Sequence, residues 1–158
     1  MRPAPFFKAR QMLTNTIRPA TKQDASAIRC LISQFGVQAE LSLLERQLDK
    51  MAGDPCYEVY VYETNNRVLG YVVFHFLPRT AFTGETVFIS DMVAEFSDRN
   101  LFVTKALEQQ VTKLAWARKC DRIQLHCHTM ATDRRRLYEK QGYAACEKYY
   151  AKRLIYAE

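Results

Sequence analysis

Residues 88–105, FISDMVAEFSDRNLFVTK, decide the fold of this chain, because they join an apolar strand to a long helix through a basic turn. We predict the strand over residues 86–94 and the helix over residues 100–118, where apolar side chains recur at helical spacing. A second signature lies at residues 136–143, RLYEKQGY, where a tyrosine-bearing helix ends at a glycine. Together these segments predict strands alternating with helices in the second half of the chain.

The first half follows the same rules. Thr21 and Asp24 form a capping-box-like helix start, and Gly36 ends that helix. The other predicted elements are strands at residues 16–20, 57–63, 67–76, 122–127 and 143–155 and helices at residues 38–51 and 133–141. The resulting order, β-α-α-β-β-β-α-β-α-β, predicts an α/β (α+β) domain with a mixed, mostly antiparallel sheet flanked by helices.

Composition limits the class of protein. The chain has 158 residues, enough for one domain with its own core, and no apolar run approaches the roughly 20 residues that span a bilayer. Its formal charge of +6 favours anionic partners. The five cysteines are odd in number and scattered, so we expect reduced thiols and a cytoplasmic location.

Residues 1–15 are basic and amphipathic, with no acidic residue. One interpretation is a targeting segment, although a secretory apolar stretch and a small-residue cleavage site are missing. We favour the other interpretation, an N-terminal extension that packs on the domain or on a partner subunit.

The two signatures, in this order, resemble the GNAT family of acyl-CoA-dependent N-acetyltransferases. The resemblance covers nearly all of residues 16–156 and implies a single GNAT-like domain at residues 16–158. It implies acetyl-CoA as co-substrate and a primary amine as acceptor, on a small molecule, a polyamine, a lysine side chain or a protein N terminus. The alternative is a catalytically impaired GNAT-fold module that binds a partner and holds CoA weakly or not at all.

In the family, the end of the fourth strand and the start of the central helix hold the CoA. The resemblance assigns this role to Met92, Val93, Ala94, Arg99, Asn100, Val103, Thr104 and Lys105. The family's three glycine positions carry Asn100, Phe102 and Thr104, and Thr104 could offer its hydroxyl to a phosphate. Two interpretations of Phe102 stay open. Either its ring points away from the phosphates, under the adenine or into the core, or it keeps CoA out.

The catalytic assignments are Tyr138 and Asp91. The resemblance implies that the Tyr138 hydroxyl protonates the departing thiolate and that the N–H of Met92 stabilises the oxyanion. Ser90 occupies the position where many members carry a glutamate base, so Asp91, Glu85 or His75 could draw the proton from the amine. No metal is expected, because on a strand His126 and His128 share one face while Cys127 lies on the other.

The acceptor and other partners are less constrained. An aromatic lining would suit a cation, and the candidates are Tyr57, Tyr60, Phe74, Phe76, Tyr149 and Tyr150. A basic run from Arg118 to Arg136 suggests nucleic acid, but no recognition motif accompanies it, so we expect neither a nucleic-acid nor a membrane partner. A homodimer stays open.

Overall fold

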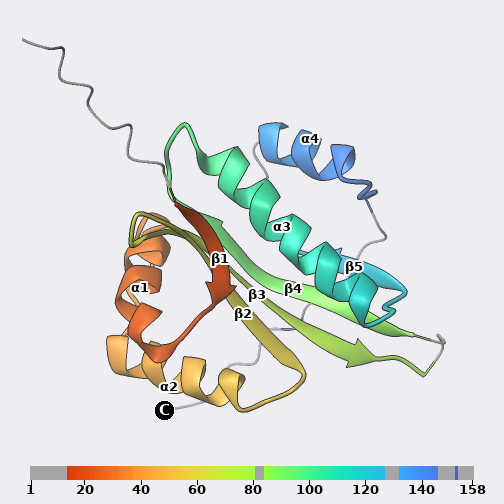
Figure 1. Ribbon diagram of the computed structural model, residues 1–158, viewed down its shortest axis with the longest axis horizontal. Coiled ribbons are helices and arrows are strands. Elements are labelled where there is room, and N and C mark those ends of the chain that lie inside the picture. The colour runs from red at the N-terminus through yellow and green to blue at the C-terminus, as the bar shows by residue number, and fades with distance from the viewer. Residues whose placement is uncertain (1–13, 81–83, 127–131, 146–151, 153–158) are drawn as a thin grey trace, which may run out of the picture. The chain divides into compact units, whose positions relative to one another are not determined.

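Within the residues that the computed structural model describes, 14–80, 84–126, 132–145 and 152, five strands form one sheet (Figure 1). The strands lie in chain order: β1 (Asn15–Pro19), β2 (Tyr57–Thr64), β3 (Arg67–Pro78), β4 (Glu85–Ala94) and β5 (Arg122–Leu125). Neighbours pair antiparallel except β4 and β5, which are parallel. A turn with positive φ at Asn65 and Asn66 joins β2 to β3, as tight hairpins require.

Helices cover both faces of this sheet (Figure 1). The short 3₁₀ helix η1 (Lys22–Asp24), α1 (Ala25–Ser33) and α2 (Leu41–Ala52) lie on one side, and α3 (Asn100–Ala117) lies on the other. Each face has its own apolar cluster, since strand side chains alternate between faces. Val61 and Val73 pack toward α1 and α2, whereas Phe74 and Val87 pack toward α3.

Helix α3 approaches β3 closely at Gly70. A Cβ atom there would lie 2.7 Å from Val103 Cγ1 of α3 and 2.9 Å from the backbone oxygen of Val93. Both distances are shorter than van der Waals contact allows. The Val93 oxygen is a backbone atom of the sheet and cannot move aside as a side chain can. The missing side chain therefore sets how near the first turn of α3 lies to β3 and β4.

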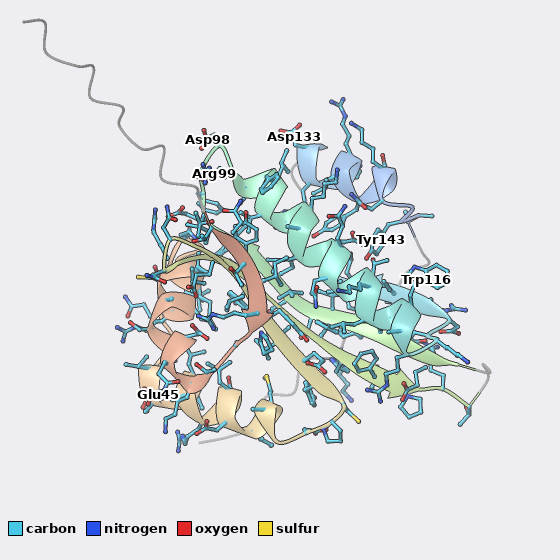
Figure 2. The ribbon with its side chains drawn as sticks, viewed as in Figure 1. Glu45, Asp98, Arg99, Trp116, Asp133 and Tyr143 are labelled. Atoms are coloured by element: carbon cyan, nitrogen blue, oxygen red, sulfur yellow. The ribbon has the colours of Figure 1, made fainter. Side chains whose placement is uncertain are left out.

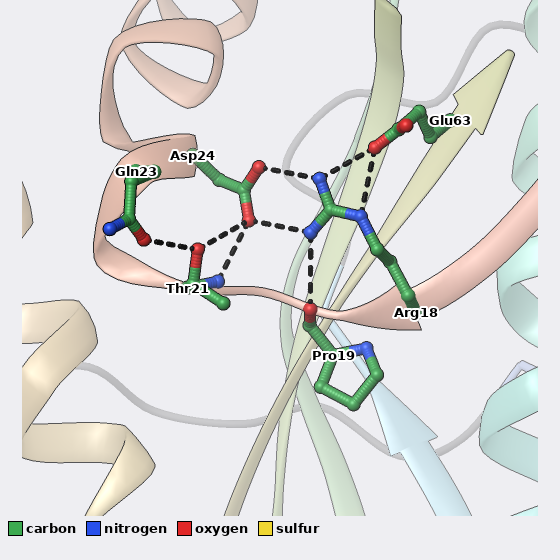
Figure 3. Close-up of polar contacts among 6 residues, drawn as sticks. All are labelled: Arg18, Pro19, Thr21, Gln23, Asp24 and Glu63. Atoms are coloured by element: carbon green, nitrogen blue, oxygen red, sulfur yellow. Dashed lines mark hydrogen bonds and ion pairs between the residues drawn. The ribbon is translucent and has the colours of Figure 1, made fainter. Parts of the chain in front are cut away.

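The junction between β1 and α1 is fixed by a charged network around Arg18 (Figure 3). The guanidinium donates to both carboxylate oxygens of Asp24 at 2.9 Å and to Glu63 at 2.8 Å. The backbone N–H of Thr21 also donates to Asp24, at 2.7 Å, which confirms the predicted role of Asp24 at this helix start. Burial by itself would raise the pKa of Asp24, but these hydrogen bonds lower it overall.

The chain's contacts divide it into two compact units, residues 1–127 and 128–158, and the second is described by itself. Its described part contains α4 (Thr132–Lys140), which confirms the helix predicted at residues 133–141. The closing strand predicted at residues 143–155 lies mostly outside the described residues, and residues 143–145 have no regular structure. The predicted α/β class and the mostly antiparallel sheet are confirmed.

Replacement of Asp24 by asparagine is expected to lower the free energy of unfolding by about 2 kcal/mol at neutral pH, because Arg18 loses one of its two charged acceptors and keeps Glu63 alone. The pKa of Asp24 is lowered in the fold, so its contribution is present above the ordinary aspartate value. It is lost as the pH falls through the lowered one.

The difference between wild type and variant should therefore shrink in acid. Urea unfolding at several pH values measures this, with Asp49→Asn as control, since Asp49 forms an exposed ion pair with Lys22 at 3.6 Å. An equal loss in both variants would show that the Arg18 network contributes nothing special.

Candidate functional site

A β-bulge interrupts β4 at Ser90. Ile89 pairs with Phe74 of β3 and Asp91 pairs with the preceding residue, Val73, so Ser90 is one residue too many. The Ser90 hydroxyl donates to the carbonyl of Val73 at 3.2 Å. After the bulge the side chains of β4 exchange faces, and Asp91 comes to lie on the α1–α2 side.

The ladder between β4 and β5 ends close to the bulge. In the described residues it runs from Thr86 opposite Arg122 to Ile89 opposite Leu125, while β4 continues to Ala94. The predicted cofactor residues Met92, Val93 and Ala94 all belong to this continuation. Beyond the end of a ladder, a strand can accept hydrogen bonds from an extended ligand.

Asp91 is the acidic group of this segment. Its side chain is exposed, yet the protein behind it desolvates the carboxylate and raises its pKa. Burial, and then the negative charge of Asp91, raise the pKa of the buried Tyr71 on the same face. Asp91 is thus an ionisable group with a raised proton affinity next to the bulge.

His75, another predicted base, lies on the same face of the neighbouring strand. Its Nδ1 atom is buried and has no hydrogen-bond partner among the residues that the structure describes, and burial lowers the pKa of the imidazole. The imidazole stands between the rings of Tyr57, at 5.2 Å, and Phe88, at 5.1 Å. Glu85, the third candidate, pairs with Arg118 at 2.6 Å and so has a structural partner.

The turn between β4 and α3 is closed by Asn100, which the resemblance noted in the sequence aligns with a glycine position. Its side-chain amide donates to the carbonyls of Ala94 and Glu95 at 3.0 and 2.9 Å. Its backbone N–H donates to Ser97 at 3.1 Å. Asn100 therefore shapes the turn with a side chain that glycine does not have.

The first turn of α3 presents backbone N–H groups. Val103 already donates to Arg99, but no described hydrogen bond uses the N–H of Leu101 or Phe102. No acidic residue lies in this turn, and Arg99 and Lys105 are exposed. Figure 2 shows Asp98 and Arg99 where α3 begins. A helix start of this kind attracts anions.

Phe102 is directed away from β5. Its ring is 59% exposed and meets the ring of Tyr62 edge-on, with centroids 6.2 Å apart. Tyr62 belongs to β2, which β3 separates from β4. Of the two interpretations of Phe102, this geometry favours the one in which the ring leaves the amides accessible, although the ring lies on the surface and not in the core.

Val103 and Thr104 have buried side chains. Val103 packs at Gly70, and the hydroxyl of Thr104 donates to the carbonyl of Asn100 at 2.8 Å. The sequence suggested this hydroxyl for a phosphate, but in the structure it forms a bond within the helix. Among the side chains that the sequence assigned to the anion, Arg99 and Lys105 are the charged ones, and both are exposed.

In the second unit, α4 ends in a Schellman motif. The N–H of Tyr143 donates to the carbonyl of Tyr138 at 3.0 Å and that of Gly142 to Glu139 at 3.1 Å, with φ of +91° at Gly142. The rings of Tyr138 and Tyr143 meet edge-on, 5.5 Å apart. The predicted catalytic tyrosine thus also takes part in the helix stop.

Other predictions from the sequence have mixed outcomes. Phe74 and Phe76 cannot line an acceptor pocket, because both are buried beneath α3, whereas Tyr57 is exposed on the opposite face. Tyr149, Tyr150, Cys127 and His128 lie outside the described residues. The described residues contain no group of three or more metal-binding side chains, and none of the described helices has the length and apolar character of a membrane span.

Comparison with known proteins decides the family. Residues 25–143 match the sequence profile described as the acetyltransferase (GNAT) family. The chain belongs to this family. The resemblance seen in residues 88–105 and 136–143 is thereby confirmed, and a family of acetyltransferases that generally uses acetyl-CoA is the right context for the site. A search of curated proteins by sequence found no significant match.

Solved structures share the fold at low sequence identity. A transcriptional regulator from Bacillus halodurans C-125 matches with a TM-score of 0.80 and 19% identity, over 89% of this chain and 100% of that one. Glucosamine-6-phosphate N-acetyltransferase from Arabidopsis thaliana gives 0.77 and 16%, over 90% and 99%. Ribosomal-protein-alanine N-acetyltransferase from Brucella melitensis biovar Abortus 2308 gives 0.69 and 19%, over 89% and 100%.

Truncation of Phe102 to alanine is expected to leave acetyl-CoA affinity almost unchanged, since the ring packs on Tyr62. The free energy of unfolding should fall by about 1 kcal/mol as the ring pair is lost. Calorimetric titration and a melting curve measure both, with Leu101→Ala, a change at an exposed neighbour without a ring contact, as control. A marked gain in affinity specific to Phe102→Ala would show that the ring obstructs the site.

Proposed function

We propose that this protein transfers an acetyl group from acetyl-CoA directly to a primary amine. The observation that carries the proposal is the segment from the bulge at Ser90 to the start of α3, in a member of an acetyltransferase family. In this segment β4 continues beyond its last pair with β5. The helix that follows begins with two backbone N–H groups, those of Leu101 and Phe102, that form no hydrogen bond within the described residues.

The binding roles follow from this segment. The continuation of β4 over Met92, Val93 and Ala94 would pair with the pantetheine amides as an added strand does. The diphosphate would lie at the N–H groups of Leu101 and Phe102, with Arg99 and Lys105 as counter-charges. The side chains of Asn100, Val103 and Thr104 would support the turn and helix from within.

In the chemical step, the amine nitrogen attacks the thioester carbonyl, a C–N bond forms and the C–S bond breaks. Asp91, whose raised pKa strengthens it as a base, would take the amine proton through water. The N–H of Met92 would stabilise the oxyanion, and the hydroxyl of Tyr138 would give its proton to the departing thiolate. Water would then return a proton to Tyr138.

The acceptor is a primary amine in this proposal, on a small molecule, a polyamine, a lysine or a protein N terminus. Two structural relatives carry names that place the acetyl group on nitrogen, of an alanine and of a glucosamine phosphate. Their low identity with this chain leaves the choice among amines to experiment.

Acetyl-CoA is expected to stabilise the protein against heat, since a ligand that binds only the native state adds about 2.7 kcal/mol at a hundredfold excess over Kd. A thermal-shift titration with acetyl-CoA measures this, and acetate at equal concentration is the control. No shift and no heat of binding at millimolar acetyl-CoA would favour the impaired binding module instead.

Tyr138→Phe is expected to lower kcat about 10²-fold, because the departing thiolate loses its proton donor, with acetyl-CoA affinity nearly unchanged. The ring contact with Tyr143 is retained in phenylalanine, so the melting temperature should stay close to wild type. Steady-state kinetics with a panel of amines tests this, and Tyr143→Phe, which removes the hydroxyl of the partner ring, is the matched control. Wild-type turnover in Tyr138→Phe would remove this residue from the mechanism.

A further inference from the structure

The end of α1 is bonded to the turn that precedes α3. Gln34, which follows the last residue of α1, donates from Nε2 to the carbonyl of Leu31 at 2.8 Å. Its Oε1 accepts the backbone N–H of Phe96 at 2.6 Å, although the two residues are 62 positions apart. One amide thus links the helix end to the turn.

A ring contact joins the same two segments. Phe35 meets Phe96 edge-on, with centroids 5.0 Å apart and an interplanar angle of 73°. Both rings are exposed over about half of their surface, so burial of apolar area contributes little to the stability of this contact. A hydrogen bond and an aromatic pair at adjacent positions restrain the turn in both distance and orientation.

Apart from these contacts, the turn is held on this side at residue 95, where Glu95 donates its backbone N–H to the carbonyl of Leu69 at 2.8 Å and pairs with Arg67. Gln34 and Glu95 line a hollow of about 560 Å³ between α1 and the β2–β3 turn, together with Arg67 and Val68. Without the hydrogen bond to Gln34, Phe96 could move toward this space, because the bonds at residue 95 hold Glu95 and not Phe96 itself. Close packing, which holds most turns in place, is lacking here.

The restraint matters because the turn carries no glycine. Asn100 and Phe102 occupy positions where glycine would let the backbone adapt to a bound phosphate. A turn that adapts less must already hold its N–H groups in the binding geometry, and preorganisation of this kind raises affinity. Asn100 holds the turn from the α3 side, and Gln34 holds it from the α1 side.

We propose that Gln34 and Phe35 are positioning residues of the acyl-CoA site, which hold the turn at residues 95–99 so that the start of α3 can receive the diphosphate. This inference rests on the proposed function. Neither residue needs to touch the ligand, since both act through Phe96.

The test compares Gln34→Met, which keeps side-chain length and loses the amide, with Gln38→Met, an exposed glutamine with no described bond to the turn. In Gln34→Met, amide hydrogen exchange without ligand is expected to accelerate at residues 96–102 and to stay unchanged in β3. Acetyl-CoA affinity measured by calorimetry should fall about tenfold, as for one lost hydrogen bond. Phe35→Ala should act in the same direction.

Each other outcome has a definite meaning. Unchanged exchange at residues 96–102, or faster exchange with wild-type affinity, overturns the inference. Faster exchange throughout β3 with reduced affinity also overturns it, because Gln34 would then serve general stability. If the wild-type protein binds no acetyl-CoA, the proposed function is refuted, and the positioning role with it. If wild type and Gln34→Met bind acetyl-CoA equally, the positioning role alone is refuted.

Discussion

The close approach of α3 to the sheet at Gly70 is the constraint on which the rest of the structure depends. Because no Cβ stands between them, Val103 rests on β3 beside the backbone of Val93. This contact fixes the first turn of α3 next to the far end of β4, so the strand's last residues and the helix's first N–H groups belong to one small region. An added methyl group would lift the helix start and separate the two halves of the candidate site.

The turn that connects β4 to α3 has no glycine, and side-chain hydrogen bonds hold its backbone instead. The amide of Asn100 closes it on the carbonyls of Ala94 and Glu95, and the hydroxyl of Thr104 in turn bonds to Asn100. Phe102, the residue least compatible with a phosphate, rests its ring on Tyr62 of β2. A glycine-rich turn gives a ligand access to its backbone because no side chain stands in the way, whereas this turn is held by side-chain hydrogen bonds and directs its bulky group outward.

Periodicity predicted the elements well, because apolar spacing reflects which face of a helix or strand is covered. The helix at residues 100–118 and the hairpin of β2 and β3 are examples. Sequence could not give contacts that join distant segments. Nothing in the letters around Gln34 indicates a bond to Phe96, and Phe74 and Tyr57 look equally suited to a pocket until their faces are known. The motif from which Tyr138 is predicted to be catalytic also contains Gly142 and Tyr143, which form a helix stop, so the motif alone does not separate a catalytic role from a structural one.

The bulge at Ser90 decides which face of the sheet carries Asp91. Ile89 faces α3 and Asp91 faces α1 and α2 only because one extra residue stands between consecutive partners on β3. The position depends on which residue of β4 pairs with Val73 and not on the identity of residue 90. Exchange of that serine for another side chain would preserve the pairing, and its removal would leave Asp91 opposite Val73 in a regular ladder. If residue 90 paired with Val73 instead, the carboxylate would turn to the α3 side of the sheet. In such a segment the pairing register decides which face carries the carboxylate, and a scan of substitutions would not detect it.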